Sequence, residues 1–124
     1  MIPMGDYLAR GRDSTLRMVQ LEDWEALDRV EAFVDVEEIN GIFLGLGDLM
    51  LSSGKSPSDP AVQALVDRAL VASQRRGIPC GVAVGTGEEA KRYLDRGFPL
   101  VMIGNDCTMF GRAAAGMVAA ARAG

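Results

Sequence analysis

The sequence has no histidine, and this absence excludes a large part of enzyme chemistry. Ser-His-Asp and Cys-His nucleophiles, histidine general bases and histidine metal ligands all require an imidazole. The two cysteines, Cys80 and Cys107, have neither the spacing of a metal-binding motif nor that of a redox motif, so we expect two small buried thiols. Chemistry carried by this sequence must therefore use carboxylates, Lys, Arg, Tyr, Cys or a metal.

Long apolar runs and basic clusters are also missing. No run approaches the about 20 apolar residues of a membrane-spanning helix, and residues 1–6 lack the charged and apolar regions of a signal peptide. Thirteen basic residues stand against seventeen acidic ones, a formal charge of −4, and no basic run is interleaved with aromatics. We therefore expect no membrane partner, no nucleic-acid partner and a cytoplasmic location.

The pattern of apolar residues predicts one α/β domain over residues 1–124. Residues 1–15, polar and broken by glycine, predict a lead-in helix or loop, and residues 16–124 predict four strand-then-helix units. The strands are expected at 16–21, 41–45, 81–84 and 100–104, and the helices after the capping residues Asp23, Asp59, Thr86 and Asn105. Residues 49–59 are expected to form a loop, and the last helix to bury an apolar stripe.

Repeated strand-then-helix units predict a parallel sheet with right-handed crossovers. Two arrangements fit this order: an open sheet with helices on both faces, or part of an eight-stranded β/α barrel with all helices outside. In both arrangements function lies at the carboxyl ends of the strands, which is where Glu22 and Asp48 fall.

Glu22 and Asp48 predict a site for a hard divalent cation. Side chains alternate along a strand, so Gln20 and Glu22 share one face. The second strand reaches Asp48 through Gly45 and Gly47, and glycines let backbone N–H groups approach a ligand closely. Taken singly, each acid has a simpler explanation, Glu22 as a favourable charge at a helix start and Asp48 as a loop cap. Taken as a pair, they favour the metal site.

Four segments together resemble the HpcH/HpaI aldolase family: residues 19–22 (VQLE), 45–49 (GLGDL), 90–94 (AKRYL) with Gly97, and 104–108 (GNDCT). These are metal-dependent class II aldolases that cleave 4-hydroxy-2-oxo acids to pyruvate and an aldehyde. The resemblance runs from about residue 7 to residue 122 and covers only the second half of the family's domain. It therefore implies half of a (β/α)8 TIM barrel, with four parallel β-α units that correspond to strands five to eight.

By this resemblance Glu22 and Asp48 are the protein ligands of a Mg²⁺, Mn²⁺ or Co²⁺ ion. Gln20 corresponds to the residue at the carbonyl region of pyruvate, and the N–H groups of Gly47 and Asp48 correspond to the site of its carboxylate. The resemblance thus implies a lyase whose small-molecule partner is pyruvate or a 4-hydroxy-2-oxo acid. A metal ion held by both oxygens of pyruvate stabilises the enolate formed on carbon-carbon cleavage.

The sequence also departs from the family. Proline and alanine usually stand where this chain has Leu46 and Gly47, and leucine where it has Ala83, which implies a differently shaped pocket. The family's histidine base, its supporting aspartate and its arginine belong to the other half-barrel, so no catalytic residue is placed on this chain. The alternative function is a non-catalytic half-barrel that binds a divalent metal or a 2-oxo acid, or serves only as an oligomerising scaffold. Four strands covered on one side leave an open face, so we expect a homo-oligomer.

Overall fold

Four parallel strands form one sheet in the computed structural model, which describes residues 2–123 without the side chains of residues 12 and 13. They are β1 (Met18–Leu21), β2 (Gly41–Leu44), β3 (Cys80–Val84) and β4 (Leu100–Ile103). The sheet order is β1-β2-β3-β4, so each strand pairs with the next one along the chain. A sheet that advances in one direction is built like a segment of a barrel rather than like a doubly wound sheet, whose order reverses.

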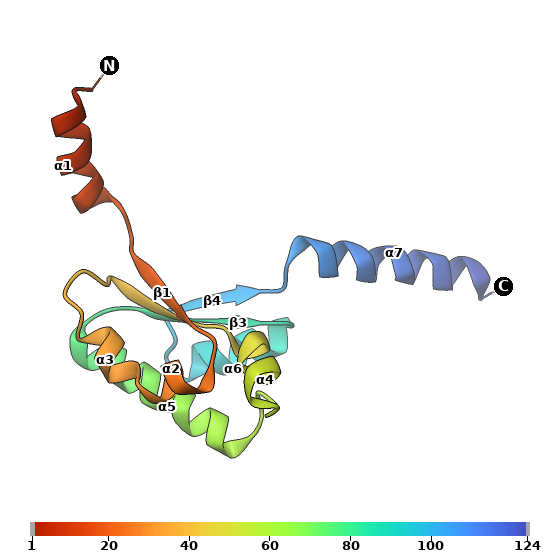
Figure 1. The fold of residues 1–124 in the computed structure, drawn as a ribbon. Helices are drawn as coiled ribbons and strands as arrows, with labels where there is room; N and C mark the ends of the chain where they lie inside the picture. Colours follow the sequence, from red (N-terminus) through yellow and green to blue (C-terminus); the bar gives the residue numbers. More distant parts are fainter. Residues whose placement is uncertain (1, 124) are drawn as a thin grey trace.

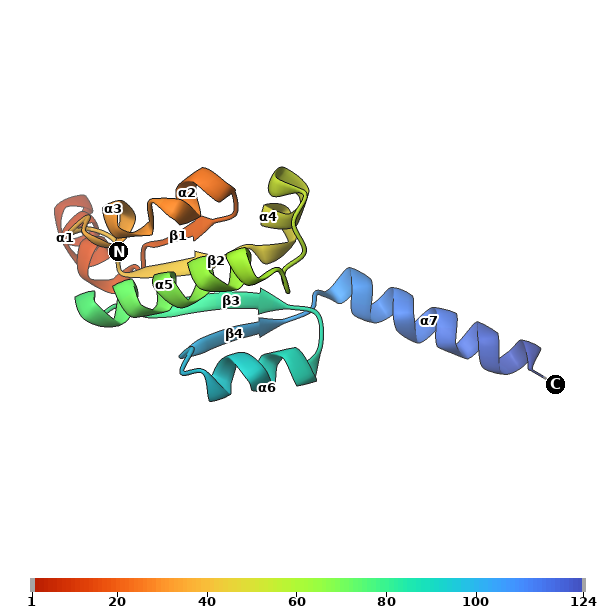
Figure 2. The same ribbon diagram turned by 90° about the horizontal axis from the view of Figure 1, so that it is seen from below.

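The crossover helices all cover the same face of this sheet. Figure 1 shows α2 (Trp24–Asp28), α3 (Val30–Val34), α5 (Pro60–Arg76) and α6 (Gly87–Asp95) below the strands. Seen from that side, α5 crosses the middle of the sheet and α6 runs beside β4 (Figure 2). Between helices and sheet lies the core, whose fully buried members include Leu27, Ile42, Leu44, Val66 and Val82. The prediction of half a TIM barrel, four parallel β-α units with helices on one side, is confirmed.

The predicted helix starts are also confirmed. The Asp23 carboxylate accepts a hydrogen bond from the Ala26 N–H at 2.9 Å, and the Asp59 carboxylate accepts one from the Ala61 N–H at 2.8 Å. Thr86 and Glu89 form a complete capping box at the start of α6. These caps depend on residues close in sequence, which is why the sequence alone locates them.

Two segments differ from expectation. The helix after Asp23 is divided at Arg29 into α2 and α3. Residues 46–53, expected to belong mostly to a loop, form α4 (Leu46–Ser53). Leu46 and Leu49, three residues apart on one helical face, are only 4% and 1% exposed, so their burial stabilises a helix that the glycines and serines around them do not predict.

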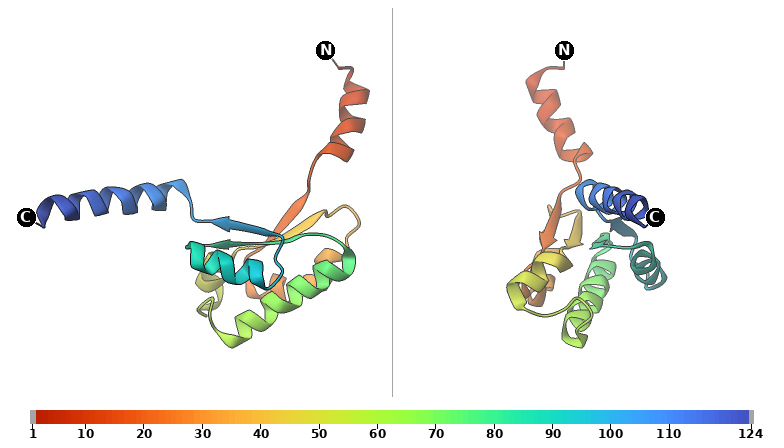
Figure 3. Two further views of the ribbon diagram at one scale, coloured as in Figure 1. Left: turned by 180° about the vertical axis from the view of Figure 1, so that it is seen from behind. Right: turned by 90° about the vertical axis from the view of Figure 1, so that its right-hand side faces the viewer.

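The terminal helices α1 (Met4–Ser14) and α7 (Asp106–Arg122) project away from the sheet, as Figure 3 shows. The expectation that α7 buries an apolar stripe is wrong for this chain: Phe110 and Met117 are 76% and 74% exposed. Since β4 is an edge strand, α7 has no further strand beside β4 to cover within residues 2–123. The expectation of two buried thiols is confirmed for Cys80, where burial raises the pKa of the thiol to about 11, and is wrong for Cys107, which is exposed on α7. No helix within residues 2–123 is long and apolar enough to cross a membrane.

Candidate functional site

The carboxyl ends of β1 and β2 are joined directly. The Gly45 N–H donates to the Leu21 carbonyl at 3.0 Å, which extends the pairing of the two strands by one step. The Ser52 hydroxyl, on α4, lies 3.5 Å from the Glu22 carbonyl oxygen. Glu22 follows β1 and α4 follows Gly45, so Glu22 and Asp48 lie at the same end of the sheet, both exposed.

Gln20 and Glu22 contact each other on the open face of the sheet. The Gln20 Nε2 donates to the Glu22 Oε2 at 2.6 Å, a short bond of the kind that a charged acceptor makes. This bond favours the orientation of the Glu22 carboxylate in which Oε2 faces Gln20. A side-chain amide has two N–H donors, so the second donor of Gln20 remains available to a ligand.

Gly45 lies directly beneath this pair. A Cβ at position 45 would come within 2.8 Å of the Gln20 Nε2 and 2.9 Å of the Glu22 Cβ, closer than non-bonded atoms approach. The absence of a side chain at Gly45, the residue after β2, therefore leaves the space in which the side chains of Gln20 and Glu22 lie. The sequence shows that Gly45 is a glycine, but only the register of the two strands shows which residues need it to be one.

Asp48 lies in the first turn of α4. The Leu49 N–H donates to the Gly45 carbonyl at 3.0 Å, so the N–H groups of Gly47 and Asp48 precede the regular helical bonds. Such N–H groups, at the positive end of the helix dipole, are suited to an anion. Among the described residues no hydrogen bond joins Asp48 to Glu22, and no group of three or more acidic, cysteine or histidine side chains gathers into a metal centre.

The structure thus brings Gln20 and Glu22 into contact and places Gly47 and Asp48 at the same end of the sheet. Two exposed carboxylates without a soft ligand suit a hard cation such as Mg²⁺ or Mn²⁺ that keeps positions for water and substrate. Because Gly45 has no side chain, the space beside Glu22 is open to a bound ion. The residues present therefore fit such an ion.

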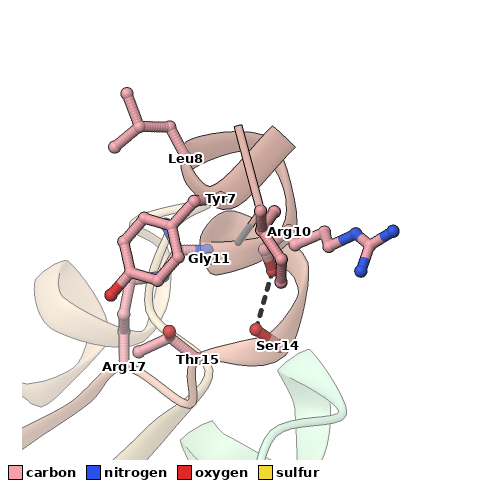
Figure 4. A pocket seen from close by; sticks show the side chains of 8 residues that line it. Tyr7, Leu8, Arg10, Gly11, Ser14, Thr15 and Arg17 are labelled. Carbon is pink, nitrogen blue, oxygen red and sulfur yellow. Dashed lines mark hydrogen bonds between the residues drawn. The ribbon is translucent and has the colours of Figure 1, made fainter. Parts of the chain in front are cut away.

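One hollow lies at the carboxyl end of the sheet, near the candidate site, and another lies at the amino end. One, of about 380 Å³, begins at Gly47 and passes Ala83 at the carboxyl ends of β3 and β4; sequence reasoning did not predict it. The larger one, of about 610 Å³, lies beside α1 and is drawn in Figure 4, where the Ser14 hydroxyl donates to the Arg10 carbonyl at 2.7 Å. Arg17, which lines it, immediately precedes β1, so this hollow lies at the amino end of the sheet, away from Glu22.

Known proteins share both sequence and fold with this chain. A sequence profile of the HpcH/HpaI aldolase/citrate lyase family matches residues 6–113. The chain belongs to this family. A 4-hydroxy-2-oxo-heptane-1,7-dioate aldolase of Escherichia coli is 35% identical over 116 residues, which are 92% of this chain and 44% of that protein.

Solved structures show the same relationship. A family member from Burkholderia cenocepacia J2315 superposes with a TM-score of 0.84 at 26% identity, over 95% of this chain and 47% of that one. An HpcH/HpaI aldolase from Desulfitobacterium hafniense DCB-2 shares the fold with a TM-score of 0.86 at 17% identity. The match covers 99% of this chain and 49% of that one. The chain therefore spans about half the length of the relatives it matches.

Proposed function

We propose that this chain is the metal-binding and 2-oxo-acid-binding half of a carbon-carbon lyase that cleaves a 4-hydroxy-2-oxo acid to pyruvate and an aldehyde. The observation that carries the proposal is the Gln20–Glu22 pair, bonded at 2.6 Å above Gly45 and at the same end of the sheet as Asp48. Membership of an aldolase family and the name of the Escherichia coli relative support the reaction class.

In this proposal Glu22 and Asp48 hold a Mg²⁺, Mn²⁺ or Co²⁺ ion. When bound, the ion supplies Lewis-acid stabilisation of the enolate of pyruvate. Gln20 orients the Glu22 carboxylate through one amide hydrogen and donates the other to the 2-oxo oxygen of the substrate. The N–H groups of Gly47 and Asp48 donate to the substrate carboxylate, which the positive end of the α4 dipole also favours.

The chain by itself binds its ligands better than it turns them over. The sequence contains no histidine to serve as general base, and a missing base typically lowers a rate by roughly 10²–10⁴-fold. The same fact favours the second candidate function, a half-barrel that binds metal and 2-oxo acid without catalysis. Pyruvate release from a 4-hydroxy-2-oxo acid in the presence of Mn²⁺ separates the two: slow turnover above the rate with Mn²⁺ alone supports the lyase, and binding with no turnover above that rate supports the non-catalytic half-barrel.

Calorimetric titration with Mn²⁺ tests the metal site. Replacing Glu22→Gln together with Asp48→Asn should abolish binding, because both charged ligands are lost while the side-chain shapes remain. The matched control is Glu37→Gln together with Glu38→Gln, which removes the same charge from two exposed residues of a turn and should leave binding unchanged. Unchanged binding in the Glu22 and Asp48 double variant would place the metal elsewhere.

A further inference from the structure

The face of the sheet opposite the crossover helices is open within residues 2–123 (Figure 1). On the covered face Ile42, Leu44 and Val82 are fully buried. On the open face Leu100 and Met102 are 40% and 51% exposed. Burial of apolar surface stabilises a protein, so this face is suited to contact with another chain.

Both edges of the sheet are open as well. β1 (sequence MVQL) and β4 (sequence LVMI) each pair with one strand only within residues 2–123. Monomeric proteins protect such edges with charged side chains, proline or bulges, and neither strand contains a charged residue or a proline. Since all four strands are parallel, the free edge of β4 can pair with the free edge of β1 in another copy.

A second copy of this chain occupies both edges at once. A two-fold axis along the strands places β4 of each copy beside β1 of the other, in the parallel orientation of the rest of the sheet. Two four-stranded sheets then make eight strands, the number at which inward side chains just fill a closed barrel. Two sheets packed face to face would leave every edge free, so closure is favoured.

The register between the two copies follows from the pairing inside one copy. One row of aligned residues crosses the four strands: Gln20, Phe43, Gly81 and Leu100. The right-handed tilt of strands in such a barrel shifts a row toward the amino end by about eight residues in a full circuit, and so by about four in each half. Leu100 therefore aligns about four residues before the partner's Gln20. The same shift brings Met102 beside the partner's Met18, and Gly104 beside the partner's Gln20.

We propose that a second copy of this chain covers the open face, with β4 of each copy paired to β1 of the other, and that the partner's β4 forms one wall of the candidate site. Gln20 and Glu22 belong to the edge at β1, and both are exposed. The partner's Gly104, which has no side chain, shields the pair from water without displacing it. Exclusion of water strengthens the attraction between an ion and a carboxylate, so ion binding and association promote each other. Only this last step rests on the proposed function.

Disulfide cross-linking tests the pairing, in a Cys107→Ser background that removes the exposed native thiol. Met18→Cys together with Met102→Cys should give a covalent dimer of twice 13.2 kDa on a non-reducing denaturing gel. Inside one copy β2 and β3 hold the two positions about 14 Å apart, too far for a disulfide. Neither substitution alone should cross-link, since the two-fold axis puts its two copies on opposite sides of the barrel.

Met18→Cys together with Val71→Cys is the matched control, because Val71 is 63% exposed on α5, which covers the other face. It should remain a single chain on the gel. Cross-linking of the single variants as readily as of the Met18 and Met102 pair would indicate face-to-face packing and overturn the proposal. A pair that circular dichroism shows to be folded and that does not cross-link would also overturn it.

Light scattering on the unmodified chain tests the proposal without any cysteine substitution. The mass should be twice 13.2 kDa, and Mn²⁺ should tighten dimerisation about tenfold, within the usual range for coupled sites. Glu22→Gln together with Asp48→Asn should dimerise without this dependence on Mn²⁺. A monomer, or a dimer that binds Mn²⁺ without becoming tighter, would overturn the partner's role in the site and leave the proposed function intact. Calorimetry that detects no Mn²⁺ binding to a cross-linked dimer would overturn the proposed function and leave the pairing intact.

Discussion

Beneath the bonded pair of Gln20 and Glu22, Gly45 provides the space that the candidate site requires. Its substitution is therefore a sensitive probe of the site. In Gly45→Ala the new methyl group would lie within 2.9 Å of both side chains, so the pair must move and the Mn²⁺ affinity should fall. Overpacking should also lower the free energy of unfolding by about 1–3 kcal/mol, measured by urea denaturation.

Gly47→Ala is the control for this substitution, since a Cβ there meets no atom within 4 Å. The methyl group lies in a helix, where alanine is preferred to glycine, so stability should be kept or slightly raised. Equal effects of the two substitutions on Mn²⁺ affinity would show that the clearance above Gly45 is not what holds Glu22 in place.

The sequence predicted which residues of the site lie near one another, but not the contacts between them. Strand alternation put Gln20 and Glu22 on one face, and the parallel order of strands put Asp48 at the same end. The 2.6 Å bond and the clearance above Gly45 depend on the register between β1 and β2, which no local pattern specifies. The hollow that begins at Gly47 depends on where α6 and α7 begin in space, so the sequence did not indicate it.

Among the elements, α3 and α5 are joined by an ion pair that makes stability depend on pH. The Arg68 guanidinium donates to both oxygens of Glu31, at 2.7 and 2.6 Å, and this pairing lowers the pKa of Glu31 from 4.5 to about 2. Between these values the unfolded chain binds a proton that the folded chain does not, so the contribution of the pair is complete above about pH 4.5 and is lost as the pH falls toward 2.

Glu31→Gln should therefore lower the urea midpoint slightly at pH 7, and the difference from the wild-type chain should shrink toward zero near pH 2. The effect is small because both side chains are about two-fifths exposed, at 39% and 41%, and solvent screens the pair. Urea denaturation at pH 7, 4 and 2.5 measures it, with Glu37→Gln as the control. A difference that stays constant with pH would contradict a contribution from the ionised pair.

Elements defined by local rules were predicted well, and elements defined by packing were not. The caps at Asp23, Asp59, Thr86 and Asn105 each depend on a side chain and a backbone N–H two or three residues away. The helix α4 depends instead on the burial of Leu46 and Leu49 beneath it. For α7, the sequence predicted the helix but not the exposure of its apolar residues, because a helical period does not state which surface covers them.

The whole molecule leaves one face of its sheet without a covering helix among the described residues. That face carries apolar side chains of three strands, among them Met18, Phe43, Leu100 and Met102, and the last two are 40% and 51% exposed. Both edge strands, β1 and β4, also lack a second neighbour within residues 2–123. Open apolar faces and free sheet edges favour association with another chain.

We therefore expect this chain to form oligomers, with the open face and the apolar stripe of α7 as the surfaces in contact. Light scattering at low micromolar concentration should give a mass well above the 13.2 kDa of one chain. Phe110→Glu together with Met117→Glu, which places charges on exposed positions of α7, should weaken the association without unfolding the sheet. A stable 13.2 kDa monomer with cooperative unfolding would contradict this expectation.

The function proposed for the whole molecule requires that Glu22 and Asp48 hold a divalent ion to which a 2-oxo acid binds. Proton relaxation measures this directly, because bound Mn²⁺ shortens the relaxation time of nuclei close to it. The methyl protons of pyruvate should relax faster with Mn²⁺ and the wild-type chain than with Mn²⁺ alone, and Glu22→Gln together with Asp48→Asn should remove this increase. An equal increase in that double variant would contradict the claim.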